Sequence, residues 1–125
     1  MNPFQHTLLQ CPLASNLSPV CYAKGDSAAS NHYIREEDSE VCQNIIEENG
    51  PPVGLPNAAT ITSTKAAHLP ISQNLPSHAQ KARILPHLKS ASLISLGQLA
   101  DGGCMSILTK DKLSVINEDT CIANI

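Results

Sequence analysis

The sequence predicts an all-β protein with one or two short helices, on three observations. Nine prolines, together with many Ser, Thr and Asn residues, divide the 125 residues into short segments. Apolar and polar residues roughly alternate in TITSTKAAHLPIS (60–72), which is typical of a half-buried strand or hairpin arm. Turn-forming residues, DGG at 101–103 and KDK at 110–112, separate the later apolar segments.

The segments follow one another in a consistent order. SPVCYA (18–23) predicts a strand that leads into a tight turn at residues 26–28, and the acidic segment 31–50 predicts a short helix ending at Gly50. KARILPHL (81–88) predicts a second strand, and MSILTKDKLSVI (105–116) predicts a hairpin about its KDK turn. We expect most of the following side chains to be buried: Leu85, Leu93, Ile94, Leu96, Leu99, Ile107 and Val115.

Composition limits the class of protein. The length suits one domain, and with one Phe, two Tyr and no Trp its core must consist of Leu, Ile, Val and Ala. Eight basic and eleven acidic residues give a net charge of -3, without a basic cluster, so we expect no nucleic acid and no membrane as partner. The first residues lack the basic flank of a signal peptide, which favours a cytoplasmic location.

Cysteines, histidines and carboxylates offer further candidates for chemistry. The five cysteines are widely spaced, form no C-x-x-C pair and favour free thiols over a metal site, and we expect no cofactor. His32 has no Ser or Cys nucleophile context, so a structural position is favoured over a general base. Glu36, Glu37 and Asp38 favour a helix start or a solvated face over a cation site.

The segment VCYAKGDSAASNHYI (20–34) places one aspartate, Asp26, among small residues. A carboxylate with such neighbours can be approached closely from several directions, which suits catalysis. An ordinary turn, in which the carboxylate accepts hydrogen bonds from nearby backbone N–H groups, uses the same residue types. The tripeptide Asp26-Ser27-Ala28 alone leaves both the catalytic and the structural interpretation open.

Three ordered segments carry a resemblance to a known family. GDSAASNHYIREED (25–38) resembles the catalytic turn of the retropepsin-like aspartic proteases of copia-type retrotransposons, where Asp-Ser-Gly-Ala-Ser/Thr precedes a His and an aromatic residue. GPPVGLPNAATITSTKAAHLPIS (50–72) resembles the segment downstream in those polyproteins. KARILPHLKSASLISLGQLADGGCMSILTKDKLSVI (81–116) resembles the end of the domain. The resemblance covers residues 18–117.

The resemblance implies a small closed or partly open β-barrel of the retropepsin (acid protease) type. The domain it implies is residues 18–117, followed by a tail at 118–125. Residues 1–17 match nothing in the resemblance, and their proline and asparagine content predicts a flexible arm. The implied activity is that of an aspartic endopeptidase which processes a Gag-Pol polyprotein. Its substrate is a polypeptide, and it works as a homodimer because each chain supplies one catalytic aspartate, Asp26.

Further residues take roles from the same resemblance. Ser27 braces the two catalytic loops, Leu96 and Gly97 form a second apolar signature behind them, and a mobile flap falls at residues 62–69. The chain departs from the family at the third motif position, which is Ala28 and not glycine. This departure favours an alternative, a decayed or repurposed fragment of a retroelement polyprotein that keeps part of the fold without peptidase activity.

Overall fold

The computed structural model describes residues 7–8, 22–55, 58–88, 91–117 and 120–124, which are mostly β-strands. The strands are β1 (Thr7–Leu8), β2 (Tyr22–Asp26), β3 (His32–Arg35), β4 (Gln43–Glu47), β5 (Pro52–Gly54), β6 (Thr60–Thr62), β7 (Lys65–His68), β8 (Lys81–Leu85), β9 (Ser92–Ser95), β10 (Met105–Leu108), β11 (Leu113–Asn117) and β12 (Thr120–Asn124). The helices are the 3-10 helix η1 (Glu36–Val41) and the α-helices α1 (Ser77–Gln80) and α2 (Leu96–Asp101). The all-β prediction is confirmed at this level.

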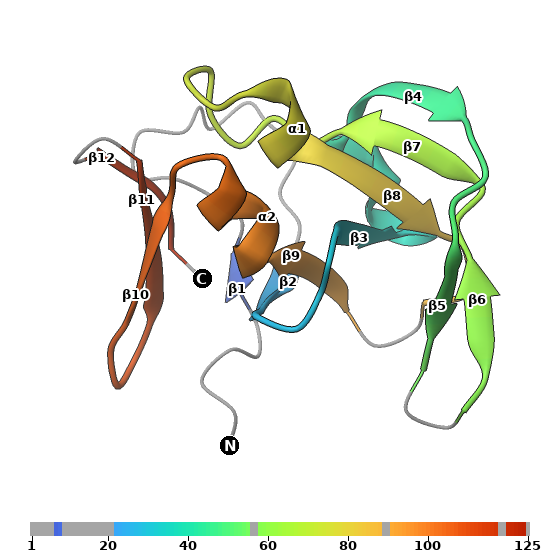
Figure 1. Ribbon diagram of the computed structural model, residues 1–125, viewed down its shortest axis with the longest axis horizontal. Coiled ribbons are helices and arrows are strands. Elements are labelled where there is room, and N and C mark those ends of the chain that lie inside the picture. The colour runs from blue at the N-terminus through green and yellow to red at the C-terminus, as the bar shows by residue number, and fades with distance from the viewer. Residues whose placement is uncertain (1–6, 9–21, 56–57, 89–90, 118–119, 125) are drawn as a thin grey trace.

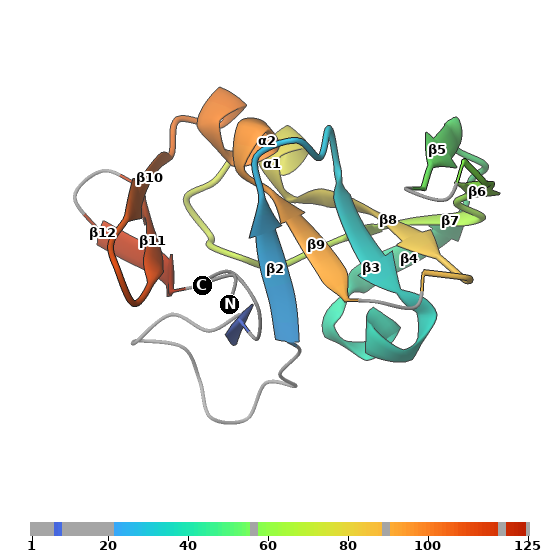
Figure 2. The ribbon, with the colours of Figure 1, turned by 90° about the horizontal axis from the view of Figure 1, so that it is seen from below.

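The strands form three sheets. Seven of them are ordered β1-β2-β9-β3-β8-β7-β4, with β2 parallel to β9 and β3 parallel to β8, while β3 and β9 are antiparallel. The sheet β10-β11-β12 and the hairpin β5-β6 lie at opposite ends of the molecule (Figures 1 and 2). Because the large sheet ends at β1 and β4, the described residues form an open sheet, and the closed form of the expected barrel is wrong.

The main core packs the large sheet against both α-helices and the sheet β10-β11-β12. Its buried residues come from β2, β3, β7, β8, β9, β11 and β12, from both α-helices and from the segment between β7 and α1. Of the side chains expected to be buried, those fully buried are Leu85, Ile94, Leu99 and Val115, and those half-buried are Leu93 and Leu96. Ile107 is 40% exposed, because it lies on the outer face of β10, all of whose residues are exposed.

The helix expected to end at Gly50 is wrong. The segment forms the strand β3, the short η1 and the strand β4. Two local features explain the difference: Asn44 has a positive φ of 53°, which a helix does not tolerate, and Ile46 pairs with Ala66 of β7. Tertiary pairing with β7 therefore overrides the helical pattern of the acidic segment.

The flap expected at residues 62–69 is also misplaced. β7 lies inside the large sheet between β4 and β8, and Ala66, Ala67 and Leu69 are buried there. The projecting hairpin is β5-β6, one segment earlier (Figure 1). Small alanine side chains pack closely in an interior strand, so the glycine-free segment is core and not a mobile arm.

The ends of the chain extend the sheets. β12 lies within the expected tail and pairs with β11, and β1 pairs with β2. The rest of the expected arm, residues 1–6 and 9–17, lies outside the described residues. None of the described helices is long and apolar enough to cross a bilayer.

Candidate functional site

Asp26 ends β2 and begins a tight turn. It lies in register with Ser95, the last residue of the parallel strand β9. The backbone N–H of Ala28 donates to Asp26 Oδ1 over 2.8 Å, which is an Asx turn. The predicted turn at residues 26–28 is therefore confirmed. Of the strand predicted at 18–23, Tyr22 and Ala23 belong to β2, and residues 18–21 lie outside the described residues.

Ala28 adopts this turn without strain. In the described part of the chain, the non-glycine residues with positive φ are Asn44 and Ala58, so Ala28 has an ordinary negative φ. Ser27 and Ala28 are both exposed. Alanine in place of the motif glycine thus fits the folded chain, and its methyl group affects only what approaches the turn from outside.

His32 holds the far side of the Asp26 turn against the protein interior. Its side chain is fully buried, and its Nδ1 accepts a hydrogen bond from the Ser95 backbone N–H over 2.9 Å. The other ring nitrogen, Nε2, therefore carries the proton and donates to the Ala79 carbonyl over 2.7 Å. The backbone N–H of His32 donates to Gln98 Oε1 over 2.9 Å.

The neutral ring suits this position. Burial lowers the pKa of His32, although the hydrogen bond to the Ala79 carbonyl acts in the opposite direction. Both ring nitrogens are occupied by backbone groups, which gives His32 a positioning role rather than that of a general base. The structural interpretation favoured by the sequence agrees with these contacts.

Ser95 and Gln98 connect the Asp26 turn to α2. Ser95 is the N-cap of α2: its Oγ accepts from the Gln98 backbone N–H over 3.0 Å and donates to the Ala29 carbonyl over 2.6 Å. The Gln98 side-chain amide also donates to the His78 and Lys81 carbonyls, each over 2.7 Å. Sequence reasoning missed both residues, although the S-x-x-Q spacing of residues 95–98 is a capping signal.

The second apolar signature lies at the same place. Leu96 opens α2 and lines the cleft that also contains Asp26. Gly97 is exposed, and a Cβ added to it would meet only Ser95 Oγ, at 3.9 Å. The fold brings Leu96 and Gly97 next to the Asp26 turn, but nothing within the described chain requires a glycine at 97.

An open cleft of about 540 Å³ lies beside Asp26. The end of β2 and the turn form one wall, and β9, α2 and the β10-β11 hairpin form the rest. Its lining residues are Lys24, Gly25, Asp26, Ser27, Leu93, Leu96, Ser106, Leu108 and Leu113. No residue of the β5-β6 hairpin lines it, since Val53 and Ile61 pack instead against a small cluster of Tyr33, Leu85 and Leu88.

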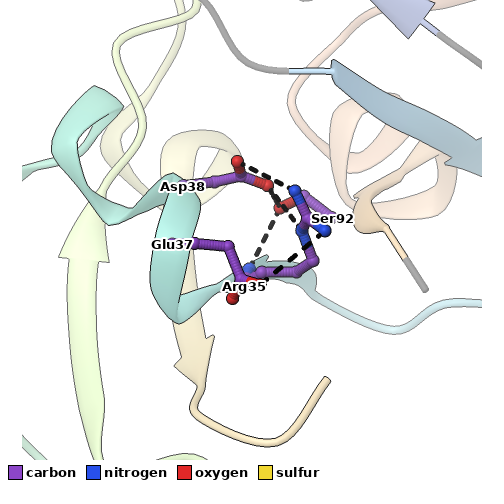
Figure 3. A network of polar contacts seen from close by, with 4 residues as sticks. All are labelled: Arg35, Glu37, Asp38 and Ser92. Carbon is purple, nitrogen blue, oxygen red and sulfur yellow. Dashed lines mark hydrogen bonds and ion pairs between the residues drawn. The ribbon is translucent and has the colours of Figure 1, made fainter. Parts of the chain in front are cut away.

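A charged network holds the opposite end of the β3–β9 pair. Arg35 donates to Asp38 Oδ2 and Oδ1 over 2.9 and 3.2 Å, and Ser92 Oγ donates to Asp38 Oδ2 over 2.7 Å (Figure 3). The Arg35 backbone N–H donates to Ser92 Oγ over 3.0 Å. Burial alone would raise the pKa of Asp38, but the hydrogen bonds from Arg35 and Ser92 and the guanidinium charge outweigh it and lower the pKa.

The acidic run at the start of η1 is engaged in ion pairs. Glu36 lies 3.6 Å from Lys65 Nζ, and Glu37 lies 3.8 Å from an Arg35 nitrogen. No three His, Cys, Asp or Glu side chains in the described segments are grouped so as to hold a metal ion. Burial and the nearby Asp38 charge raise the pKa of the Cys42 thiol to about 11, which leaves it unreactive at neutral pH.

Comparison of the chain with protein-family models, with curated proteins and with solved structures finds no match in any of the three.

Proposed function

We propose that the chain is the aspartic endopeptidase domain of a copia-type retrotransposon Gag-Pol polyprotein, acting on a polypeptide as a homodimer. One observation carries the proposal: the Asp26 carboxylate ends a strand at an exposed turn, on the wall of an open cleft. The three ordered segments that resemble this family add to it. In this proposal the fold is of the retropepsin type, with an open sheet.

The mechanism follows from one aspartate in each chain. A two-fold axis brings the two Asp26 carboxyls together, and the pair shares one proton because two like charges in contact do not both ionise. The shared-proton pair takes a proton from a water molecule, which attacks the peptide carbonyl. Asp26 is then the catalytic residue in each half of the dimer.

The surrounding residues position that carboxylate. The Ala28 N–H holds one oxygen of Asp26, and Ser27, exposed beside it, is available to hydrogen-bond across the two-fold axis. His32 and Ser95 fix the inner side of the turn through backbone groups. None of these inner contacts is charged, and Lys24 lines the same cleft.

Replacement of the carboxylate tests the proposal. Asp26→Asn removes the group that accepts the proton from water, and we expect cleavage of a polyprotein-like peptide to fall by at least about 1000-fold. Asp101→Asn is the matched control, because Asp101 is an exposed aspartate at the end of α2. The measurement is peptide hydrolysis at mildly acidic pH. Cleavage that survives Asp26→Asn would remove Asp26 from the mechanism.

Assembly gives an independent test. A single catalytic aspartate in each chain requires a dimer. Peptidase activity, measured over a range of protein concentrations, should therefore rise with the dimer fraction that sedimentation gives at each concentration. Activity from a chain that stays monomeric at high micromolar concentration would contradict the mechanism.

A second candidate is a decayed or repurposed polyprotein fragment that keeps this fold without peptidase activity. The exposed Ala28 methyl favours it, because it adds bulk where a second copy of the turn has to approach. The Ala28→Gly chain separates the two candidates. Cleavage that appears only with glycine indicates a decayed enzyme, and cleavage in the unmodified chain shows that the methyl is tolerated.

A further inference from the structure

The cleft beside Asp26 has one cationic side chain. Lys24 and Leu93 are register partners in the parallel pair β2–β9, so their side chains lie on the same face of the sheet. Asp26, two residues after Lys24, lies on that face as well, and all three line the cleft. The cation therefore sits on the wall that carries the proposed catalytic carboxylate.

Lys24 is open to an external anion. Within the described ranges, the ion pairs of the molecule involve Arg35, Lys65, Lys81 and Arg83, and no carboxylate lies within 4.0 Å of the Lys24 ammonium. Its side chain is half-buried and lines the cleft. A carboxylate that entered the cleft would meet a cation without a competing partner from the described chain.

Leucine side chains form the apolar part of the cleft lining. Leu93 and Leu96 are half-buried, and Leu108 is 57% exposed, although all three line the cleft. An exposed leucine on a concave wall gains free energy when a ligand covers it. Among its described lining residues, the cleft thus combines leucine side chains with two charged groups, the Lys24 ammonium and the Asp26 carboxylate of the catalytic turn.

We infer that this cleft is a specificity subsite for a glutamate side chain of an extended peptide, and that Lys24 is its specificity-determining residue. The two methylene groups of glutamate cover leucine side chains, and its carboxylate pairs with the Lys24 ammonium. A lysine at the same peptide position brings two ammonium groups together, and an alanine leaves the leucine side chains exposed. The inference rests on the proposed function, since it assigns the substrate class of the same site.

The experiment measures peptide selection in two ways. A set of peptides is assayed for cleavage by the unmodified chain. In each peptide, one position near the cleaved bond carries Glu, Ala or Lys. The same fluorescently labelled peptides are assayed for binding to the full-length Asp26→Asn chain by fluorescence anisotropy, which does not depend on catalysis. At one position we expect Glu to be preferred over Ala by about fivefold, the upper range for a partly exposed ion pair, and over Lys by more.

Two substitutions of Lys24 test its role. Lys24→Met keeps an unbranched apolar side chain of similar length, and we expect it to abolish the preference for Glu over Lys. Lys24→Glu should reverse that preference. Lys110→Glu is the matched control, because Lys110 is exposed in the β10-β11 turn and does not line the cleft; the preference should persist in it.

The outcomes separate the two proposals. If cleavage requires Asp26 but the Lys24 substitutions do not change the preference for Glu, the subsite proposal is overturned and the peptidase proposal stands. Binding with the Lys24-dependent preference, without cleavage, overturns the peptidase and leaves the charge selectivity of the cleft. If the unmodified chain and the Asp26→Asn chain are both folded, and neither cleavage nor binding of these peptides is detected, both proposals are overturned.

Discussion

The antiparallel pair of β3 and β9 is held at both ends, by opposite kinds of chemistry. Near Asp26, the fully buried and neutral His32 bonds to the backbone of Ser95. At the far end, Arg35, Asp38 and Ser92 form a charged network that is partly open to solvent (Figure 3). We call these the neutral clamp and the charged clamp.

The contrast bears on the proposed role of Asp26. If Asp26 is half of a shared-proton pair, as proposed, a charged clamp bonded to its turn would add to the effect of Lys24 in the cleft and alter the proton affinity on which the pair depends. The neutral clamp fixes the same backbone through dipoles alone. The charged clamp lies at the other end of the strands, where its field is weakest at Asp26.

Loss of the neutral clamp should have the largest effect on stability. His32→Phe keeps a ring of similar size but leaves the Ser95 N–H and the Ala79 carbonyl without their partner. Two unsatisfied groups in a buried site should lower the free energy of unfolding by about 2–4 kcal/mol, measured by urea denaturation. His87→Phe, at an exposed histidine, is the control. A loss as small as that of the control would break the comparison.

The sequence predicted much of the fold but not these clamps, for a physical reason. The turn after β2, the strand β8 and the β10–β11 hairpin depend on local patterning, and the structure has them where the sequence predicts them. The contacts of His32 with Ser95 and Ala79 join residues 63 and 47 positions apart, and only the sheet order brings them together. Local propensity contains no information on that order.

The charged clamp should give a smaller effect. Asp38→Asn removes the charge that Arg35 and Ser92 contact, and we expect the free energy of unfolding to fall by about 1–2 kcal/mol, since the site is partly solvated. Urea denaturation again provides the measurement, with Asp101→Asn as a control at an exposed and unpaired position of the described chain. If Asp38→Asn costs more than His32→Phe, the ranking of the two clamps is wrong.

The two clamps should also fail in different pH ranges. Burial lowers the pKa of folded His32 below 6.5, so the unfolded chain binds the proton first and stability falls as the pH drops below about 6.5. The pKa of Asp38 is lowered from 3.8, so its contribution is present above that value and is lost as the pH falls through the folded pKa. The pH effect should be smaller than removal of either side chain, because the other contacts remain.

Unfolding curves recorded between about pH 7 and pH 3 check this separation. His32→Phe should lose the decline that begins near pH 6.5, and Asp38→Asn should keep it while losing part of the decline at lower pH. Identical pH profiles for the two variants would show that a single set of groups controls both ranges.

Local pattern predicted the candidate site only where its residues are contiguous, and Leu96 and Gly97 were placed near it by the family resemblance alone. Asp26, Ser27 and Ala28 form one turn, and the spacing of small residues revealed it. The leucines of the cleft come from β9, α2, β10 and β11, and no sequence pattern singled out Lys24. The flap that the resemblance implied at residues 62–69 is wrong, because pairing with β4 and β8 places β7 inside the large sheet. Periodicity distinguishes strand from helix but not an interior strand from a projecting one.

The smallest effect is expected at the turn itself. Because Ala28 already has a negative φ and is exposed, Ala28→Gly gains no relief of strain and only increases the freedom of the unfolded chain. The free energy of unfolding of the monomer should fall by about 0.5 kcal/mol, measured by urea denaturation at a protein concentration where sedimentation shows the chain to be monomeric. A glycine variant that is more stable than the unmodified monomer would show strain at Ala28 and break the comparison. If stability changes as expected while dimer affinity or cleavage rises, the gain comes from closer approach of the second turn. The Ala28 methyl group would then affect the contact between two chains, which neither the neutral clamp nor the charged clamp controls.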